Sequence, residues 1–215
     1  MRDALNTFVR RNNLESLAPT RIAASVYAQW AIREWRRRGE PSPPPSAIKR
    51  RTLVEYGRRF GLRTLVETGT YYGDTVFGLR AEFDRLISIE LDPVLHRRAQ
   101  RRFAGLSNVI LLLGDSSDLI EAVIKDMAQP ALFWLDAHYM SSNKARGESD
   151  TPISAELDAI LTHSVRDHVI LIDDARDFRG QRGYPELSYL QESILRRRPD
   201  MMVDVRHDMI RICPK

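Results

Sequence analysis

Short apolar runs alternate with longer helical stretches from Arg63 onward, and this alternation constrains the fold more than any other feature. Each of five runs is four or five residues long and mostly apolar, which is typical of strands buried on both faces of a sheet. The runs are Thr64–Glu67, Leu86–Glu90, Val109–Leu113, Ala131–Leu135 and Val169–Ile172. The helical stretches between them are Asp74–Glu82, Pro93–Phe103, Ser117–Ala128 and Pro152–His163. Repeated strand-then-helix units predict an α/β protein with a parallel sheet and helices on both faces.

The C-terminal part of the chain breaks this pattern. After a predicted helix over Pro185–Arg198, the segment Met201–Cys213 holds two strand-like runs that meet near His207 and Asp208. Two adjacent strands with a tight turn between them form a β-hairpin, so one of them must run antiparallel to the rest of the sheet. We therefore expect a mostly parallel sheet that ends in an antiparallel hairpin.

Residues 1–45 are predicted to form an N-terminal helical extension that ends in a proline-rich linker. Two helices are expected there, over Asp3–Asn12 and over Thr20–Arg38, and Glu40–Pro45 (EPSPPP) is expected to be stiff. The main domain would then span residues 46–215 and begin with a helix that Ser46 caps.

The second N-terminal helix carries an apolar stripe. Ile22, Val26 and Trp30 recur every four positions, which places them on one helical face. That face must cover the main domain, a second subunit or a membrane surface, and the first two are favoured. If the stripe covers a second subunit, these helices are the expected contact of a homodimer.

Positive charge is concentrated near the N-terminus. The net charge is +4, but residues 1–64 hold 14 basic and 5 acidic side chains, a net of +9. This region could meet an acidic partner, or it could be a solvated basic face. No apolar run approaches the roughly 18–20 residues that span a bilayer, and the start lacks the apolar core of a secretory signal. The single cysteine, Cys213, leaves no intrachain disulfide, and a cytoplasmic location is expected.

Glycines and acids follow the first three predicted strands. Gly69 and Gly73 lie in the loop after the first strand, where they allow a tight turn and close approach to a ligand. Glu90 ends the second strand, 21 residues after Gly69, and suits a ribose. The third strand ends in Gly114-Asp115-Ser116, which suits an adenine edge. The G-x-G-x-x-G and phosphate-loop patterns are absent, so a cofactor without pyrophosphate is favoured, and S-adenosylmethionine fits.

Four motifs in this order resemble those of the class I S-adenosylmethionine-dependent methyltransferases. They are E-T-G-T-Y-Y-G, S-I-E-L-D-P, L-L-G-D-S and F-W-L-D-A-H, and the resemblance covers about Arg63–Cys213. It implies a Rossmann-like, seven-stranded, mostly parallel sheet. It also implies seven cofactor-binding residues, which are Glu67, Gly69, Thr70, Gly73, Glu90, Asp115 and Ser116. By the resemblance, Glu67 and Gly69 line the pocket of the amino-acid tail, Glu90 holds the ribose, and Asp115 with Ser116 contacts the adenine.

Three carboxylates follow the fourth and fifth strands. Asp136 ends the fourth strand, and Asp173 and Asp174 end the fifth. Carboxylates that converge at one sheet edge repel one another unless protons or a cation intervene, and such hard oxygen ligands suit Mg²⁺ or another divalent ion. The arrangement resembles the metal-dependent O-methyltransferases of the catechol and macrocin types. The resemblance implies that these three residues bind the metal, which would hold two adjacent substrate oxygens.

One departure from the macrocin type concerns the base. In that type, a second Asp two residues after the first is thought to accept the proton, and His138 stands at that position here. Imidazole is a competent base near neutral pH, so His138 with Asp136 forms the candidate catalytic pair. The alternative for His138 is simple hydrogen bonding, and the alternative for the Asp pair is a loop acid and a cap. The other histidines are expected at the surface, and they are His96, His163, His168 and His207.

The function that these features predict is O-methylation of a small hydroxylated molecule, such as a sugar or a natural product, with help from a divalent cation. One alternative is a methyltransferase of nucleic acid or protein that docks through the basic N-terminal region. Against it, the [DN]-P-P-[YF] signature of amino-group methylation is absent, because the fourth strand ends in L-D-A-H-Y. The other alternative is a non-methylating, hydroxylase-like relative with the same sheet.

Overall fold

A computed structural model describes residues 21–136 and 151–215, and the chain divides into two compact units, Met1–Lys49 and Arg50–Lys215. The first unit contains helix α2 (Arg21–Arg37), and helix α3 (Ser46–Arg59) crosses the boundary. At the end of α2, the indole Nε1 of Trp35 donates to the carbonyl of Pro41 at 2.7 Å and fixes the turn that follows. The helix expected over Asp3–Asn12 lies outside the described residues, and the predicted boundary after residue 45 stays a prediction.

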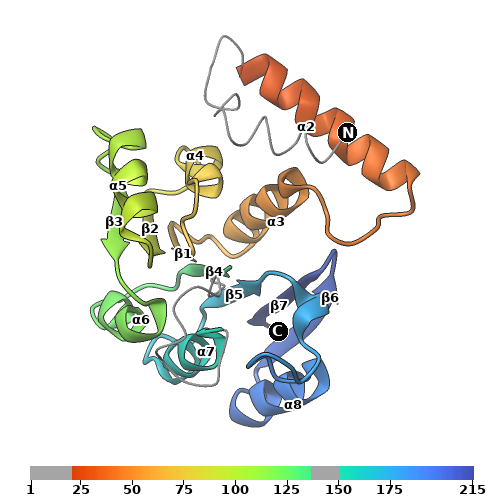
Figure 1. Ribbon diagram of the computed structural model, residues 1–215. Coiled ribbons are helices and arrows are strands. Elements are labelled where there is room, and N and C mark those ends of the chain that lie inside the picture. Colours follow the sequence, from red (N-terminus) through yellow and green to blue (C-terminus); the bar gives the residue numbers. More distant parts are fainter. Residues whose placement is uncertain (1–20, 137–150) are drawn as a thin grey trace. The chain divides into compact units, whose positions relative to one another are not determined.

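The second unit is built on a seven-stranded sheet (Figure 1). Its strands are β1 (Thr64–Thr68), β2 (Arg85–Glu90), β3 (Val109–Leu113), β4 (Leu132–Leu135), β5 (Val169–Ile172), β6 (Met201–Arg206) and β7 (Met209–Pro214). Their order is β3-β2-β1-β4-β5-β7-β6. The first five strands are parallel, and β7 runs antiparallel between β5 and β6. The predicted parallel sheet with its terminal hairpin is confirmed.

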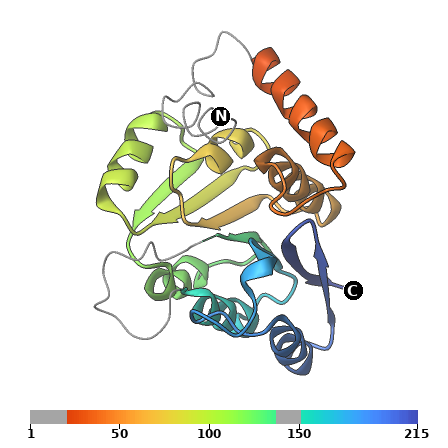
Figure 2. The same cartoon turned by 45° about the vertical axis from the view of Figure 1, so that its right-hand side comes forward.

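Helices cover both faces of this sheet (Figures 1 and 2). Helices α4 (Asp74–Leu79) and α5 (Pro93–Arg102) lie on one face. Helices α6 (Ser116–Ile124), α7 (Ile153–Thr162) and α8 (Leu187–Arg197) lie on the other. Local signals set where the helices begin: the carboxylate of Asp92 accepts hydrogen bonds from the backbone N–H groups of Val94 and Leu95, with Pro93 in the first turn.

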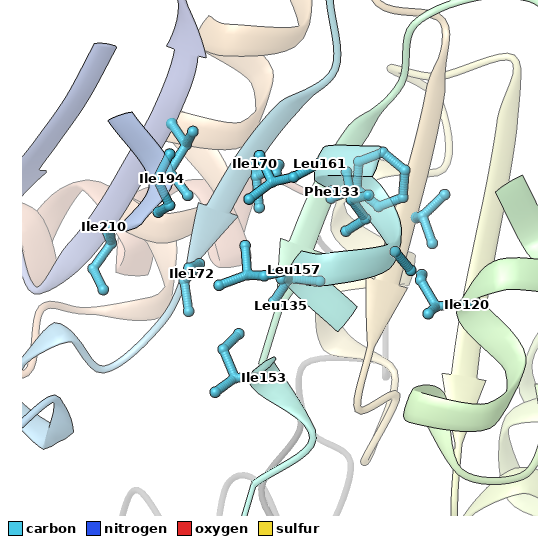
Figure 3. Close-up of a cluster of buried hydrophobic side chains, with 14 of the residues drawn as sticks. Ile120, Phe133, Leu135, Ile153, Leu157, Leu161, Ile170, Ile172, Ile194 and Ile210 are labelled. Atoms are coloured by element: carbon cyan, nitrogen blue, oxygen red, sulfur yellow. The ribbon is translucent and has the colours of Figure 1, made fainter. Parts of the chain in front are cut away.

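The main apolar core lies between the sheet and helices α6, α7 and α8 (Figure 3). Phe133 and Ile170 project from neighbouring strands, and Leu157 and Leu161 project toward them from α7. Each of these side chains is at least nine-tenths buried. Burial of one such side chain contributes about 1.5–3 kcal/mol relative to exposure. Alternate residues of each strand therefore face this core, and the residues between them face α4 and α5.

Two histidines meet where β4 and β5 begin, at the edge opposite to the predicted site. The backbone N–H of Ala131 donates to Nδ1 of His168 at 3.0 Å, so the proton of a neutral His168 must lie on Nε2. Nε2 of His168 lies 2.9 Å from Nδ1 of His163 and donates to it. Burial, together with the neighbouring His163, lowers the pKa of His168 to about 4.

The expected surface positions of the histidines are thus wrong for two of them. His168 is 2% exposed and His96 is 7% exposed. Polar residue type predicts the surface only on average, and the ring of His168 packs edge-on against Phe133 of β4. None of the helices in the described parts of the chain combines the length and the apolar character that crossing a bilayer requires.

Candidate functional site

The residues predicted to bind ligands follow the carboxyl ends of the five parallel strands. Register places these ends side by side, because Thr68 pairs with Ile89 on one side and with Leu135 on the other. Leu135 in turn pairs with Ile172, immediately before Asp173. The loops after β1, β2, β3, β4 and β5 therefore start along one edge, which is where open parallel sheets bind ligands.

The loop between β1 and α4 turns tightly at its two glycines. Gly69 (φ 86°) and Gly73 (φ 75°) both adopt left-handed backbone conformations that favour glycine. The N–H of Gly73 donates to the carbonyl of Thr70 at 2.7 Å and closes the turn. A Cβ on Gly73 would lie 2.7 Å from the ring of Phe103, so this glycine also permits close packing on α5.

Glu90 holds the tip of the same loop. One carboxylate oxygen accepts the N–H of Tyr71 at 2.6 Å, and the other accepts the N–H of Asp92 at 2.9 Å. The side chain is buried, with 7% of the residue exposed. Each carboxylate oxygen can accept a second hydrogen bond, so the predicted contact with a ribose is compatible with this arrangement.

Glu67 lies on the sheet face toward α4, at the centre of a buried hydroxyl network. The hydroxyl of Ser88 donates to its carboxyl at 2.6 Å, and the hydroxyl of Thr70 lies 2.6 Å from that of Ser88. Burial raises the pKa of Glu67 to about 8, and hydrogen bonds from Ser88 and Thr75 oppose this rise. Ser88 and Thr75 are not among the predicted site residues, although the register of β2 against β1 places Ser88 directly beside Glu67.

Nearby charges also act on Glu67. The carboxylates of Glu90 and Asp74 are among the causes of its raised pKa. Asp74 is itself paired with the guanidinium of Arg102 at 2.8 Å, and Arg102 also donates to the carbonyl of Tyr72. Arg102 thereby ties α5 to the glycine loop.

The loop after β3 is supported from the opposite face of the sheet. Asp115 caps α6, because its carboxylate accepts hydrogen bonds from the backbone N–H and the hydroxyl of Ser117 at 2.9 and 2.7 Å. Glu156 of α7 is 1% exposed, and burial raises its pKa to about 7. A hydrogen bond with the hydroxyl of Ser116 opposes this rise. Glu156 thus contacts the start of α6, directly after the loop that follows β3. It is not among the predicted site residues, because α7 lies about 40 residues beyond β3.

The three predicted metal ligands come together. Asp136, Asp173 and Asp174 each present a carboxylate oxygen, and these oxygens lie within 4.8 Å of one another. Asp173 is buried and the other two are half-buried. Backbone bonds fix the group, since the N–H of Asp136 donates to Thr68 and that of Asp173 to Leu135.

A basic side chain also touches this acidic group. The guanidinium of Arg176 pairs with Asp174 at 2.8 Å and with Asp208, whose carboxylate also accepts the N–H of Arg176 at 2.9 Å. Asp208 lies in the turn between β6 and β7. The terminal hairpin therefore contacts and stabilises the loop after β5. The local sequence does not predict this contact, because the two residues are 32 positions apart.

The predicted base cannot be placed beside these groups. His138 lies among residues 137–150, which are outside the described residues. Its role as a base stays a prediction.

Comparison with known proteins gives structural likenesses without a sequence relative. No family model matches the chain, and a search of curated proteins returns no match. The O-methyltransferase TomG from Streptomyces achromogenes, solved with SAM, is 18% identical with a TM-score of 0.56, over 96% of this chain and 95% of its own. An O-methyltransferase from Bacillus cereus, solved with SAH, is 14% identical with a TM-score of 0.59, over 99% and 97%. The SAH-bound methyltransferase PaMTH1 from Podospora anserina is also 14% identical at 0.59, over 99% and 94%.

Proposed function

We propose that this chain, which has the Rossmann-like fold of the class I S-adenosylmethionine-dependent O-methyltransferases, is itself such a methyltransferase. We propose further that it methylates a hydroxyl of a small molecule, such as a sugar or a natural product, with a divalent cation at the acidic group. The observation that carries the proposal is the gathering of Glu67, Glu90 and the three-Asp group at one sheet edge.

The residues present fit S-adenosylmethionine. Glu67 is a buried carboxyl that is suited to a cationic amino group, and Glu90 has free acceptor capacity on both oxygens for ribose hydroxyls. Ser116, beside the capping Asp115, would border the adenine, with Gly69, Thr70 and Gly73 forming the loop between these groups. When bound, the cofactor supplies an electrophilic methyl group on a sulfonium. The task of the protein is then to hold this cation beside a hydroxyl and to exclude water.

The acidic group fits a hard divalent cation such as Mg²⁺. Asp136, Asp173 and Asp174 offer three oxygen ligands from two neighbouring strand ends. Such an ion supplies Lewis-acid polarisation of substrate oxygens. Arg176 balances part of the negative charge at Asp174. His138, two residues after Asp136, would accept the proton of the substrate.

Calorimetric titration with S-adenosylhomocysteine tests the cofactor proposal. The wild type should bind, and Glu90→Ala should bind at least about tenfold more weakly, because charge-assisted hydrogen bonds contribute about 1.5–3 kcal/mol each. The matched control is Glu192→Ala, which removes an exposed carboxylate of α8 that pairs with Arg196 one helical turn away. Equal affinity of the Glu90 variant and the wild type would remove the ribose assignment.

A second proposal concerns the N-terminal unit. We propose that α2 is the contact of a homodimer, because Val26 and Trp30 are 60% and 55% exposed. Methylation of a macromolecule remains the alternative function, and the exposed arginines at the end of α2 favour it as a docking surface. Binding to RNA or DNA that weakens steeply with salt would support that alternative.

A further inference from the structure

Glu67 combines three features that rarely occur together in one carboxyl group. Only 2% of the residue is exposed, its contacts are hydroxyl groups, and the charges near it are negative. An ionised carboxylate that is buried without a cation is strongly destabilised, so such a group keeps its proton. In the free protein, Glu67 is therefore a neutral acid at pH 7.

The charged neighbours of Glu67 do not change this conclusion. Asp74 and Glu90 are both acidic, and both oppose ionisation of Glu67. Nη1 of Arg102 donates to Asp74 and to the carbonyl of Tyr72, and neither contact involves Glu67. Within residues 21–136 and 151–215, no Lys, Arg or His forms an ion pair with Glu67.

The position of Glu67 suggests which ligand group could supply a cation to pair with its carboxylate. The residue is the penultimate one of β1, directly before the glycine loop that our proposed function assigns to the cofactor. The cationic amino group of an amino-acid tail is the part of that cofactor which a carboxylate recognises. A carboxylate and an ammonium attract each other strongly in a buried site, whereas a neutral carboxyl offers only a hydrogen bond.

We propose that Glu67 exchanges its proton for the ammonium group of the cofactor, so that binding releases one proton to solvent. The O–H bond of the Glu67 carboxyl breaks, the proton passes to the buffer, and the resulting carboxylate pairs with the ammonium. Ser88 and Thr75 assist, because their hydroxyls donate to the charged form and hold it in place. This inference rests on the proposed function.

The test is titration of the protein with S-adenosylhomocysteine at pH 7 in several buffers that differ in ionisation enthalpy. The slope of the observed binding enthalpy against the buffer ionisation enthalpy counts the protons released. A group with a pKa of about 8 is about 90% protonated at pH 7, so we expect about 0.9 proton per ligand bound. Glu67→Gln, which keeps the shape of the side chain but cannot ionise, should release close to none.

If Glu67→Gln fails to fold, a second ligand can still test proton release in the wild type. 5′-Methylthioadenosine retains the adenosine and lacks the amino-acid tail, so its binding to the wild type should release no proton. Binding of S-adenosylhomocysteine with the same enthalpy in every buffer would overturn the proton exchange and leave the proposed function standing. Failure of the wild type to bind S-adenosylhomocysteine at all would overturn the proposed function and the proton exchange together.

Discussion

Acid should destabilise this protein through His168, the residue that precedes β5. Its ring cannot accept a proton without losing a hydrogen bond, because a proton on Nδ1 would face the N–H of Ala131. The folded state therefore favours the neutral ring of His168, whereas this side chain is protonated freely in the unfolded chain.

The size of the effect follows from the pKa of His168. Its value is about 4 in the folded protein and about 6.5 in the unfolded chain. A lowered pKa of a base means that the folded state binds fewer protons, so stability is complete above about pH 6.5 and is lost as the pH falls toward 4. The whole loss is at most about 3 kcal/mol, and about 2 kcal/mol of it should be reached at pH 5.

Unfolding by guanidinium chloride at pH 7.5 and pH 5 measures this loss. Other groups also respond to acid, so the decisive quantity is the difference between the wild type and His168→Gln, whose amide oxygen can still accept from Ala131. The variant should lose about 2 kcal/mol less than the wild type between the two pH values. His207→Asn is the matched control, since it removes a histidine from the β6–β7 turn, where φ is 53°, with a residue that tolerates that conformation. An identical pH dependence in the wild type and His168→Gln would refute the reasoning.

The remaining predictions concern the metal and the dimer. Asp173→Asn should make methyl transfer to a hydroxylated acceptor less responsive to added Mg²⁺, because it removes a charged ligand from the three-Asp group; wild-type activity that is insensitive to EDTA would contradict the metal proposal. Trp30→Ser should shift the molar mass measured by light scattering from dimer toward monomer, because it removes a large exposed aromatic side chain from α2; a monomeric wild type would contradict the dimer proposal.

Local patterns in the sequence predict the strands well and the helix ends less well. The five parallel strands and the hairpin occur where apolar runs and turn signals placed them, although β3 at the sheet edge is only half-buried. Helix α4 ends at Leu79 rather than at Glu82, and α6 ends at Ile124 rather than at Ala128. A helix end depends on which carbonyls find partners in the surrounding structure, so it responds to tertiary contacts that the local pattern does not contain.

The sequence alone determined the residues at the carboxyl ends of the strands, because each one follows an apolar run directly and parallel strands bring their ends to one edge. Glu67, Glu90 and the three Asp residues could therefore be predicted as neighbours. Only the tertiary structure decided which partners surround them, because those partners come from distant elements such as α7 and the terminal hairpin. It also decided their protonation, since the pKa of a carboxyl or an imidazole depends on burial and on nearby charges that no local pattern encodes.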